Sequence, residues 1–186
     1  MSGTQGFTIW FTGLSGAGKS TIADLVIPEL ERRGRVVEPL DGDVVRTHLS
    51  RGLGFSKEDR DTNIQRIGWV ASRITRHGGV TVVSAISPYE ETRQAARALV
   101  EEFGPFVCVY VHTSVEECVR RDTKGLYAKA IAGEIKEFTG ISDPYEAPVA
   151  PELTIDTEGE APQDSAARVL AYLEQRGLVG AVVTAT

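Results

Sequence analysis

Apolar runs alternate with amphipathic helical patterns along most of the chain. Five runs are typical of buried strands: residues 7–11, 35–40, 80–85, 106–111 and 153–155. Apolar positions at helical spacing predict helices at residues 21–33, 44–51, 57–77, 89–103 and 164–176. Strands that alternate with helices form a parallel sheet through right-handed crossovers. The pattern therefore predicts an α/β domain whose sheet is flanked by helices.

A glycine-rich stretch at residues 13–21 separates the first predicted strand from the first predicted helix. It reads Gly-Leu-Ser-Gly-Ala-Gly-Lys-Ser-Thr and matches the phosphate-binding loop (P-loop). In this context backbone N–H groups surround a phosphate, and the start of the helix adds a positive dipole end. We expect Lys19 to reach the outer phosphates of ATP and Ser20 to ligate Mg²⁺. The predicted ATP-binding residues of this stretch are Gly13, Ser15, Gly16, Ala17, Gly18, Lys19, Ser20 and Thr21.

Two aspartates follow the second predicted strand, where ligands of parallel sheets bind. Asp41 and Asp43 are separated by one glycine. We expect Asp41 to support the metal through a water molecule and Asp43 to face the hydroxyl that accepts a phosphoryl group. No acid follows the third predicted strand, where many P-loop proteins carry a metal-holding aspartate. The alternative for the pair is an ordinary turn with solvated aspartates.

Basic residues further along the chain suit an anionic acceptor. Arg46 and Arg60 lie downstream of the paired aspartates, and guanidinium groups bind such anions well. Residues 120–148, called the lid below, contain several cations and glycines. This composition predicts a mobile lid that excludes water from the transfer. The alternatives are a solvated helix face for the arginines and a surface helix with ordinary lysines for the lid.

Composition and charge narrow the class of protein. A net charge of -6 argues against nucleic-acid binding, so an anionic ligand must be held by local cations. Cys108 and Cys118 form no metal motif, which fits a reducing cytoplasm. We see no secretory signal pattern and no apolar run long enough for a membrane span. We expect a cytoplasmic protein without membrane or nucleic-acid partners, with residues 1–180 as a single P-loop kinase domain and 181–186 as a flexible tail.

Five further blocks of the chain resemble the adenylylsulfate kinase (APS kinase) family. They are Leu-Asp-Gly-Asp at 40–43, Leu-Gly-Phe-Ser-Lys-Glu-Asp-Arg at 53–60, Ser-Ala-Ile-Ser-Pro-Tyr at 84–89, Arg-Asp-Thr-Lys-Gly-Leu-Tyr at 121–127, and Gly-Glu-Ile-Lys-Glu-Phe-Thr-Gly-Ile at 133–141. The P-loop alone indicates only a superfamily, whereas the last three blocks together are specific. The resemblance extends from about residue 6 to residue 177. At position 137 the chain has Glu, where the resemblance leads us to expect Gly, Asn or a similar residue.

The resemblance implies transfer of the γ-phosphoryl group of ATP to the ribose 3′-hydroxyl of adenosine 5′-phosphosulfate (APS). The products would be ADP and 3′-phosphoadenosine 5′-phosphosulfate (PAPS), with Mg²⁺ as the metal. It assigns these residues to the APS site: Asp43, Arg46, Phe55, Arg60, Asn63, Ile86, Ser87, Lys124 and Phe138. In the family, Phe55 and Phe138 enclose the adenine of APS, and Arg121 belongs to the ATP side.

The resemblance also bears on catalysis and on partners. We expect Lys19, Asp41 and Asp43 to be catalytic. The family's serine at position 87 has been described as a phosphoserine intermediate, but in-line transfer needs none, so we treat Ser87 as a substrate contact. A homodimer and a functional link to ATP sulfurylase in sulfate assimilation are further expectations.

Three other functions compete with this interpretation. One is a kinase for a sugar acid, a nucleoside monophosphate or shikimate, and another is a catalytically silent module that senses nucleotides. The presence of Lys19, Ser20, Asp41 and Asp43 favours an enzyme over the silent module. A GTPase switch would need an Asn-Lys-x-Asp element, which the sequence lacks.

Overall fold

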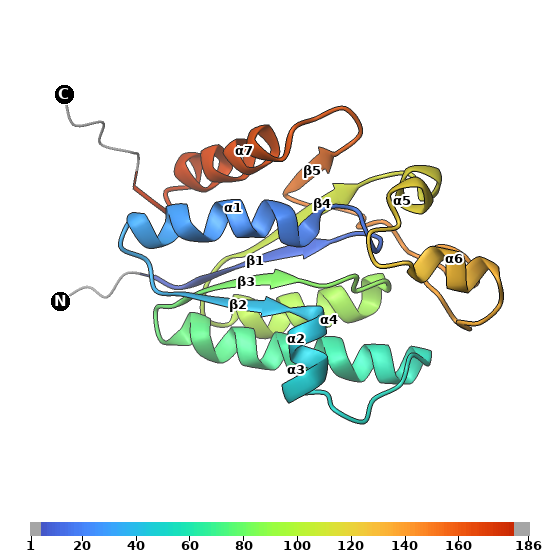
Figure 1. Cartoon of the computed structure of the whole chain (residues 1–186). Coiled ribbons are helices and arrows are strands. Elements are labelled where there is room, and N and C mark those ends of the chain that lie inside the picture. Colours follow the sequence, from blue (N-terminus) through green and yellow to red (C-terminus); the bar gives the residue numbers. More distant parts are fainter. Residues whose placement is uncertain (1–4, 181–186) are drawn as a thin grey trace.

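The computed structural model describes residues 5–180, so the tail predicted at 181–186 lies outside the described residues. Five parallel strands form one sheet in the order β2-β3-β1-β4-β5 (Figure 1). The strands are β1 (Phe7–Thr12), β2 (Val37–Asp41), β3 (Val80–Ser84), β4 (Phe106–His112) and β5 (Leu153–Asp156). After β3 the chain passes across β1 to β4, so the topological switch point flanks β1. Ligands of such sheets bind at the carboxyl ends of the strands beside this point.

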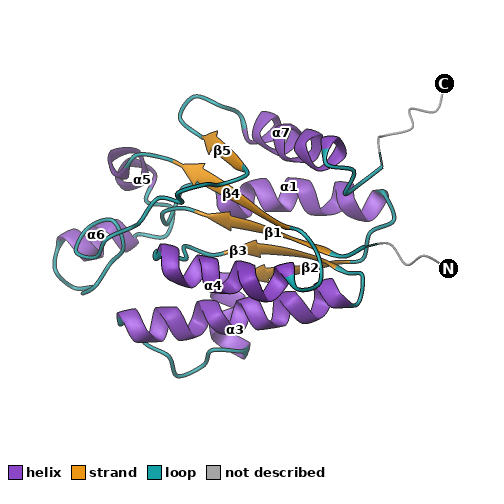
Figure 2. Ribbon diagram, turned by 180° about the vertical axis from the view of Figure 1, so that it is seen from behind, coloured by secondary structure: helices purple, strands orange, loops and turns teal. Residues whose placement is uncertain are grey.

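The described residues form seven helices. They are α1 (Lys19–Arg32), α2 (Gly42–His48), α3 (Lys57–Arg76), α4 (Glu90–Glu101), α5 (Val115–Arg121), α6 (Leu126–Ile131) and α7 (Pro162–Gln175). Helices α1 and α7 pack side by side on one face of the sheet, and α3 and α4 cover the other (Figure 2). Helices α5 and α6 lie beyond the carboxyl ends of the strands (Figure 1). The predicted α/β fold, a parallel sheet flanked by helices, is confirmed.

Strand β1 is buried on both faces and separates two hydrophobic cores. Phe7, Ile9 and Phe11 face the core beneath α1 and α7, whereas Trp10 belongs to the core beneath α3 and α4. Alternate side chains of a strand point to opposite faces, so a strand covered on both sides is apolar throughout. The ring of Trp10 stacks on that of Phe106 with centroids 5.4 Å apart. The two cores fix the position of the P-loop, which directly follows this strand.

Helix α6, inside the lid, lies outside the predicted helices, and the other observed elements differ from the predicted ones mainly at their ends. Strand β2 begins at Val37 rather than at residue 35, and Val36 is 80% exposed. It is an edge strand, which explains how it accommodates Pro39. Helix α2 begins at Gly42 rather than at residue 44, because the Asp41 side chain caps it by accepting from the Asp43 N–H. The capping contact therefore sets the paired aspartates at a strand-to-helix junction rather than in an open turn.

The helices also bear on membrane association. Among residues 5–180, no helix combines the length and the apolar character that crossing a bilayer requires.

Candidate active site

The P-loop connects the carboxyl end of β1 to the amino end of α1, and its glycines are required by its geometry. Gly13 has φ of +149°, and a Cβ there would lie 2.3 Å from the carbonyl oxygen of Val111. Gly18 has φ of +104° and immediately precedes α1, in whose first turn Lys19, Ser20 and Thr21 lie. Both conformations exclude most other residues. The loop therefore brings backbone and the start of a helix to the position where phosphate groups bind in such folds.

Lys19 is buried beneath the loop, and its contact with the outer phosphates stays a prediction. Its Nζ donates to the carbonyl oxygens of Gly13 (2.9 Å) and Leu14 (2.7 Å). Burial lowers the pKa of its ammonium group to about 8, and the charges of Asp41, Asp43 and Lys124 are close enough to contribute smaller effects. A neighbouring phosphate would favour the protonated form, so binding of the phosphate and protonation of Lys19 support each other.

Ser20 and Asp41 meet although they are far apart in the sequence. The Ser20 hydroxyl donates to Asp41 Oδ2 at 2.8 Å, while Asp41 Oδ1 accepts from the Asp43 N–H at 2.9 Å. Oxygen atoms of this kind suit Mg²⁺, which binds through few protein ligands, water and phosphate oxygens. Residues 5–180 contain no cluster of three His, Cys, Asp or Glu side chains that could hold a metal. The donor set thus fits a magnesium ion that depends on the nucleotide phosphates.

Asp43 projects from the first turn of α2 and contacts the lid. Lys124 Nζ donates to Asp43 Oδ2, and both side chains are largely exposed. The structure therefore brings the predicted acceptor-side carboxylate, a lid cation and the P-loop lysine into one region. An exposed ion pair of this kind contributes little to stability, so it can separate when a ligand enters.

Arg60 links α3 to the lid. It is 7% exposed, and its Nε donates to the carbonyl oxygen of Phe55 at 2.6 Å. Its other nitrogens donate to the carbonyl oxygen of Glu137 and the hydroxyl of Thr139, and Asp143 Oδ2 lies 3.4 Å away. The guanidinium group thereby joins the segment that carries Phe55 to the segment that carries Phe138. It anchors the lid in addition to lying in the predicted APS site.

The two predicted stacking rings lie against different partners. The ring of Phe55 is 59% exposed and lies under the guanidinium group of Arg46, 4.5 Å from its centroid. Arg46, on α2, also donates to the carbonyl oxygen of Gly54 at 2.9 Å. The ring of Phe138 packs edge-on against Tyr127, with centroids 5.0 Å apart. Enclosure of an adenine between the two rings stays a prediction.

Ile86 and Ser87 follow the carboxyl end of β3, and Asn63 lies on α3. Asn63 Oδ1, on α3, is buried without a hydrogen-bond partner among the described residues, which suits a donor from a ligand. The carbonyl oxygen of Ile86 accepts from the hydroxyl of Thr12 at 2.7 Å. Ser87 Oγ is buried, accepts from Trp10 Nε1 and donates to Thr12 Oγ1, both at 3.0 Å. A hydroxyl held in this way favours a role in shaping the site over phosphorylation.

Backbone conformation accounts for two unusual positions near the site. Ser87 has φ of +41°, and its carbonyl oxygen accepts from Arg93 Nη1 at 2.5 Å. Glu137 has φ of +53°, a region that Gly and Asn adopt more readily than other residues. The expectation of Gly or Asn at position 137 therefore has a structural reason.

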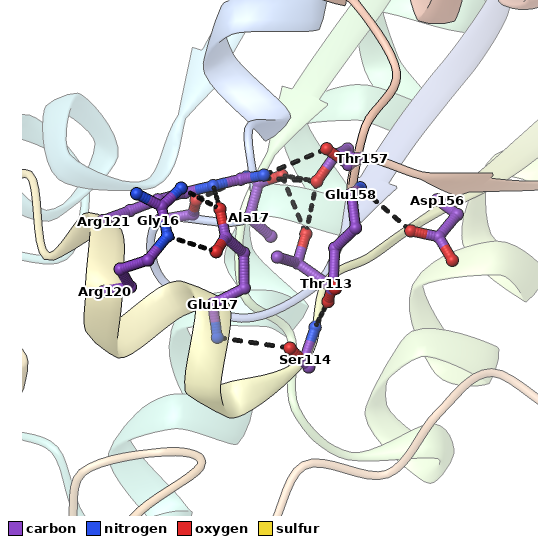
Figure 3. Close-up of polar contacts among 10 residues, drawn as sticks. All are labelled: Gly16, Ala17, Thr113, Ser114, Glu117, Arg120, Arg121, Asp156, Thr157 and Glu158. Carbon is purple, nitrogen blue, oxygen red and sulfur yellow. Dashed lines mark hydrogen bonds and ion pairs between the residues drawn. The ribbon is translucent and has the colours of Figure 1, made fainter.

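Arg121 contacts the predicted loop residue Gly16 and two residues that sequence reasoning missed, Glu117 and Thr157 (Figure 3). At the end of α5 it donates to Glu117 Oε1, to the hydroxyl and carbonyl oxygens of Thr157, and at 3.5 Å to the carbonyl oxygen of Gly16. Tyr127 donates from its hydroxyl to the carbonyl oxygen of Ser15 at 2.9 Å. Thr157 directly follows β5, so the rule that ligands bind at strand ends, applied to the last strand, would have identified it.

The fold and this site define a P-loop kinase. A family profile described as adenylylsulphate kinase matches residues 5–156. An adenylyl-sulfate kinase of Halothermothrix orenii is 52% identical over 179 residues, which cover 96% of this chain and 95% of the relative. A probable bifunctional SAT/APS kinase of Sorangium cellulosum is 55% identical over 175 residues, 94% of this chain but only 30% of that protein.

A solved structure gives the same result. The APS kinase of Mycobacterium tuberculosis in complex with AMPPNP and APS superposes with a TM-score of 0.88 at 43% identity, covering 91% of this chain and 98% of that one. The chain belongs to the adenylylsulphate kinase family.

Proposed function

We propose that this chain transfers the γ-phosphoryl group of ATP to the ribose 3′-hydroxyl of APS, giving PAPS and ADP. The observation that carries the proposal is the meeting of the P-loop, the Ser20–Asp41 pair and Asp43 at one edge of the sheet. Membership of the adenylylsulphate kinase family, and the likeness to an APS kinase solved with AMPPNP and APS, identify the substrates.

The P-loop side holds the phosphates of ATP. Backbone N–H groups and the start of α1 favour the negative charge, and Lys19 supplies a buried positive charge to the outer phosphates. Mg²⁺, held by Ser20 and through water by Asp41, would neutralise the charge that develops on the phosphates. Arg121 lies beside the loop at Gly16 and adds a further cation.

The acceptor side orients the ribose. Asp43 accepts the proton of the 3′-hydroxyl as that oxygen attacks the γ-phosphorus, and the bond between that phosphorus and the bridging oxygen of ADP breaks. In the structure Lys124 pairs with Asp43. When the substrate binds, this pair separates, and the Lys124 ammonium group can then contact the transferred phosphoryl group. Phe55 and Phe138 stack on the adenine of APS, Arg46 and Arg60 supply donors, and Asn63 Oδ1 accepts a hydrogen bond from the ligand. Ile86 and Ser87 form the bottom of the APS-binding site.

The cellular setting follows from the reaction and is part of the proposal. PAPS formation belongs to sulfate assimilation in the cytoplasm, and the enzyme acts as a homodimer without a nucleic-acid or membrane partner. ATP sulfurylase produces APS, and the bifunctional relative named above supports a functional link between the two activities.

The decisive experiment measures ADP formation with Mg·ATP and APS, beside AMP, gluconate and shikimate as acceptors. We expect turnover with APS and background rates with the others. Turnover with gluconate, shikimate or AMP in place of APS would refute the substrate. Tight APS binding without turnover would indicate the silent nucleotide-sensing module instead. Lys19→Ala, which removes the P-loop cation, is the negative control.

A further inference from the structure

Thr157, directly after β5, contacts the P-loop, the loop after β4 and Arg121 at the same time (Figure 3). Its Oγ1 lies 3.2 Å from the carbonyl oxygen of Ala17, 2.6 Å from the hydroxyl of Thr113 and 3.1 Å from Arg121 Nη1. Thr113 Oγ1 lies 3.2 Å from the same carbonyl oxygen. Two hydroxyl groups therefore stand between the arginine and one carbonyl of the P-loop.

The available protons fix the direction of these hydrogen bonds. A guanidinium group only donates, so the Thr157 hydroxyl accepts from Arg121. Each threonine hydroxyl has one proton. One of these two protons forms the hydrogen bond between the hydroxyls, and the other is donated to the carbonyl oxygen of Ala17. Whichever hydroxyl donates to the carbonyl, the chain of donors runs from Arg121 to Ala17. Hydrogen bonds in such a chain strengthen one another.

The carbonyl of Ala17 matters because of the peptide bond that it shares with Gly18. All peptide bonds of the described residues are trans, so the Gly18 N–H points away from the Ala17 carbonyl oxygen. Holding that oxygen on the two hydroxyls directs the Gly18 N–H to the opposite side of the peptide. In a P-loop, backbone N–H groups must point at the phosphates to bind them. The hydroxyls thus control one of the donors to the nucleotide.

Thr157 also fixes the arginine itself. Arg121 Nη2 donates to the Thr157 carbonyl oxygen at 3.0 Å, and its Nε donates to Glu117 at 2.8 Å. The side chain is thus held by α5 and by the loop after β5 beside the P-loop. Thr157 therefore sets the position of a cation and the orientation of a loop peptide together.

We propose that Thr157 is a positioning residue for the phosphate chain of the nucleoside triphosphate, acting through Arg121 and the Ala17–Gly18 peptide. The proposal rests on the proposed function for its ligand, but it concerns nucleotide binding rather than acceptor choice. It predicts that loss of the Thr157 hydroxyl weakens ATP binding and leaves APS binding unchanged.

The test uses Thr157→Val, which replaces the hydroxyl by a methyl group of similar size. Calorimetric titration of the variant with Mg·AMPPNP, without any acceptor, should give a Kd about tenfold higher than that of the wild type. This is the scale of one charge-assisted hydrogen bond. KM for ATP should rise similarly and KM for APS should not. Thr157→Ser, which keeps the hydroxyl, should restore the wild-type Kd. Thr154→Val on β5, an exposed threonine, is the matched control.

A second variant keeps the proposal testable if valine disturbs the fold. Thr157→Ala removes the same hydroxyl without placing a methyl group against the carbonyl. In a Thr157→Ala background, Arg121→Ala should raise the Kd for Mg·AMPPNP much less than it does alone, because the two residues act through one chain.

Three results would overturn the inference: an unchanged Kd in Thr157→Val and Thr157→Ala, an equal loss in Thr157→Ser, or additive effects in the double variant. The experiment measures nucleotide binding in the absence of an acceptor, so its result does not depend on whether APS is the substrate.

Discussion

Around the P-loop, the contacts come from backbone atoms and buried side chains, whereas on the acceptor side they come largely from long side chains that reach the lid. The carbonyl oxygens of Gly13 and Leu14 hold Lys19, and that of Ala17 lies 3.2 Å from each of two hydroxyls. Across the acceptor side, Lys124 reaches Asp43 and Arg60 reaches Thr139.

The difference has a functional consequence. Phosphates are the same in every nucleotide, so a rigid site formed by backbone suits them, and the two hydrophobic cores hold that backbone in place. In the proposed function the acceptor enters and leaves beneath the lid, which requires contacts that can be exchanged. Changes on the P-loop side should therefore affect all turnover, while changes to lid residues that contact the acceptor side, such as Thr139, should affect the acceptor selectively.

The largest effect is expected for Lys19→Ala. This change removes the buried cation that reaches the outer phosphates, and the loss of one strong electrostatic stabiliser costs about 3–4 kcal/mol of barrier. We expect kcat/KM for ATP to fall by roughly 10²–10³-fold. The unfolding temperature should not fall, because a desolvated charge is removed. Near-normal turnover would contradict the assignment.

Asp43→Asn should have the next largest effect, on the acceptor side. The amide keeps the size of the side chain but cannot accept a proton, so we expect kcat to fall by roughly 10²-fold or more. Affinity for Mg·AMPPNP should change little, as judged by calorimetry. Asp24→Asn, at an exposed position of α1, is the control. A raised KM for APS with unchanged kcat would mean that Asp43 only binds.

A pH profile tests the P-loop side without mutation. The pKa of Lys19 is about 8, so its ammonium form predominates below that pH and is lost above it. Because kcat/KM reports the free enzyme, its value for ATP should fall about tenfold between pH 7 and pH 9. The contribution of Lys19 to the free energy of unfolding should change with pH in the opposite direction to kcat/KM. Since this pKa lies below the ordinary value of 10.5, the unfolded chain binds more protons between the two values, and the contribution of Lys19 to the free energy of unfolding rises with pH there. A flat profile for kcat/KM would contradict the role of the charge.

The smallest effect is expected for Thr139→Val, which tests most specifically whether the lid and the P-loop act separately. Thr139 belongs to the lid, and its hydroxyl accepts from Arg60 on α3. We expect KM for APS to rise about fivefold, less than the full scale of a charge-assisted hydrogen bond because Arg60 keeps its contacts with Phe55 and Glu137, with KM for ATP unchanged. Thr154→Val serves again as control. Equal changes in both constants would show that lid and P-loop are not separable.

The sequence predicted those parts of the site that depend on local pattern. The P-loop and the five strands are local, because glycine spacing and apolar runs are set by neighbouring residues. The meeting of Ser20 with Asp41 was also predictable, since both follow strands whose carboxyl ends share one edge. The family resemblance, rather than residue spacing, identified the acceptor.

Most other contacts between distant side chains could not be predicted. The position of Thr157 after β5 marks a strand end, but nothing in the sequence indicates that its hydroxyl contacts Ala17, 140 residues away, and Arg121. Likewise, nothing near Arg60 indicates that Glu137 and Thr139 from the lid reach its guanidinium group. The burial of the Ser87 hydroxyl depends on Trp10, a residue of another strand. Each of these depends on how elements pack, which the periodic pattern does not specify.

The product formed from APS and Mg·ATP, identified by phosphorus NMR and mass spectrometry, tests the proposed function most directly. We expect one additional phosphoryl group on the ribose 3′-oxygen, with ADP formed in equal amount. A phosphoryl group at another position, or ADP with free phosphate and unchanged APS, would contradict the assignment of Asp43 and the lid to the 3′-hydroxyl.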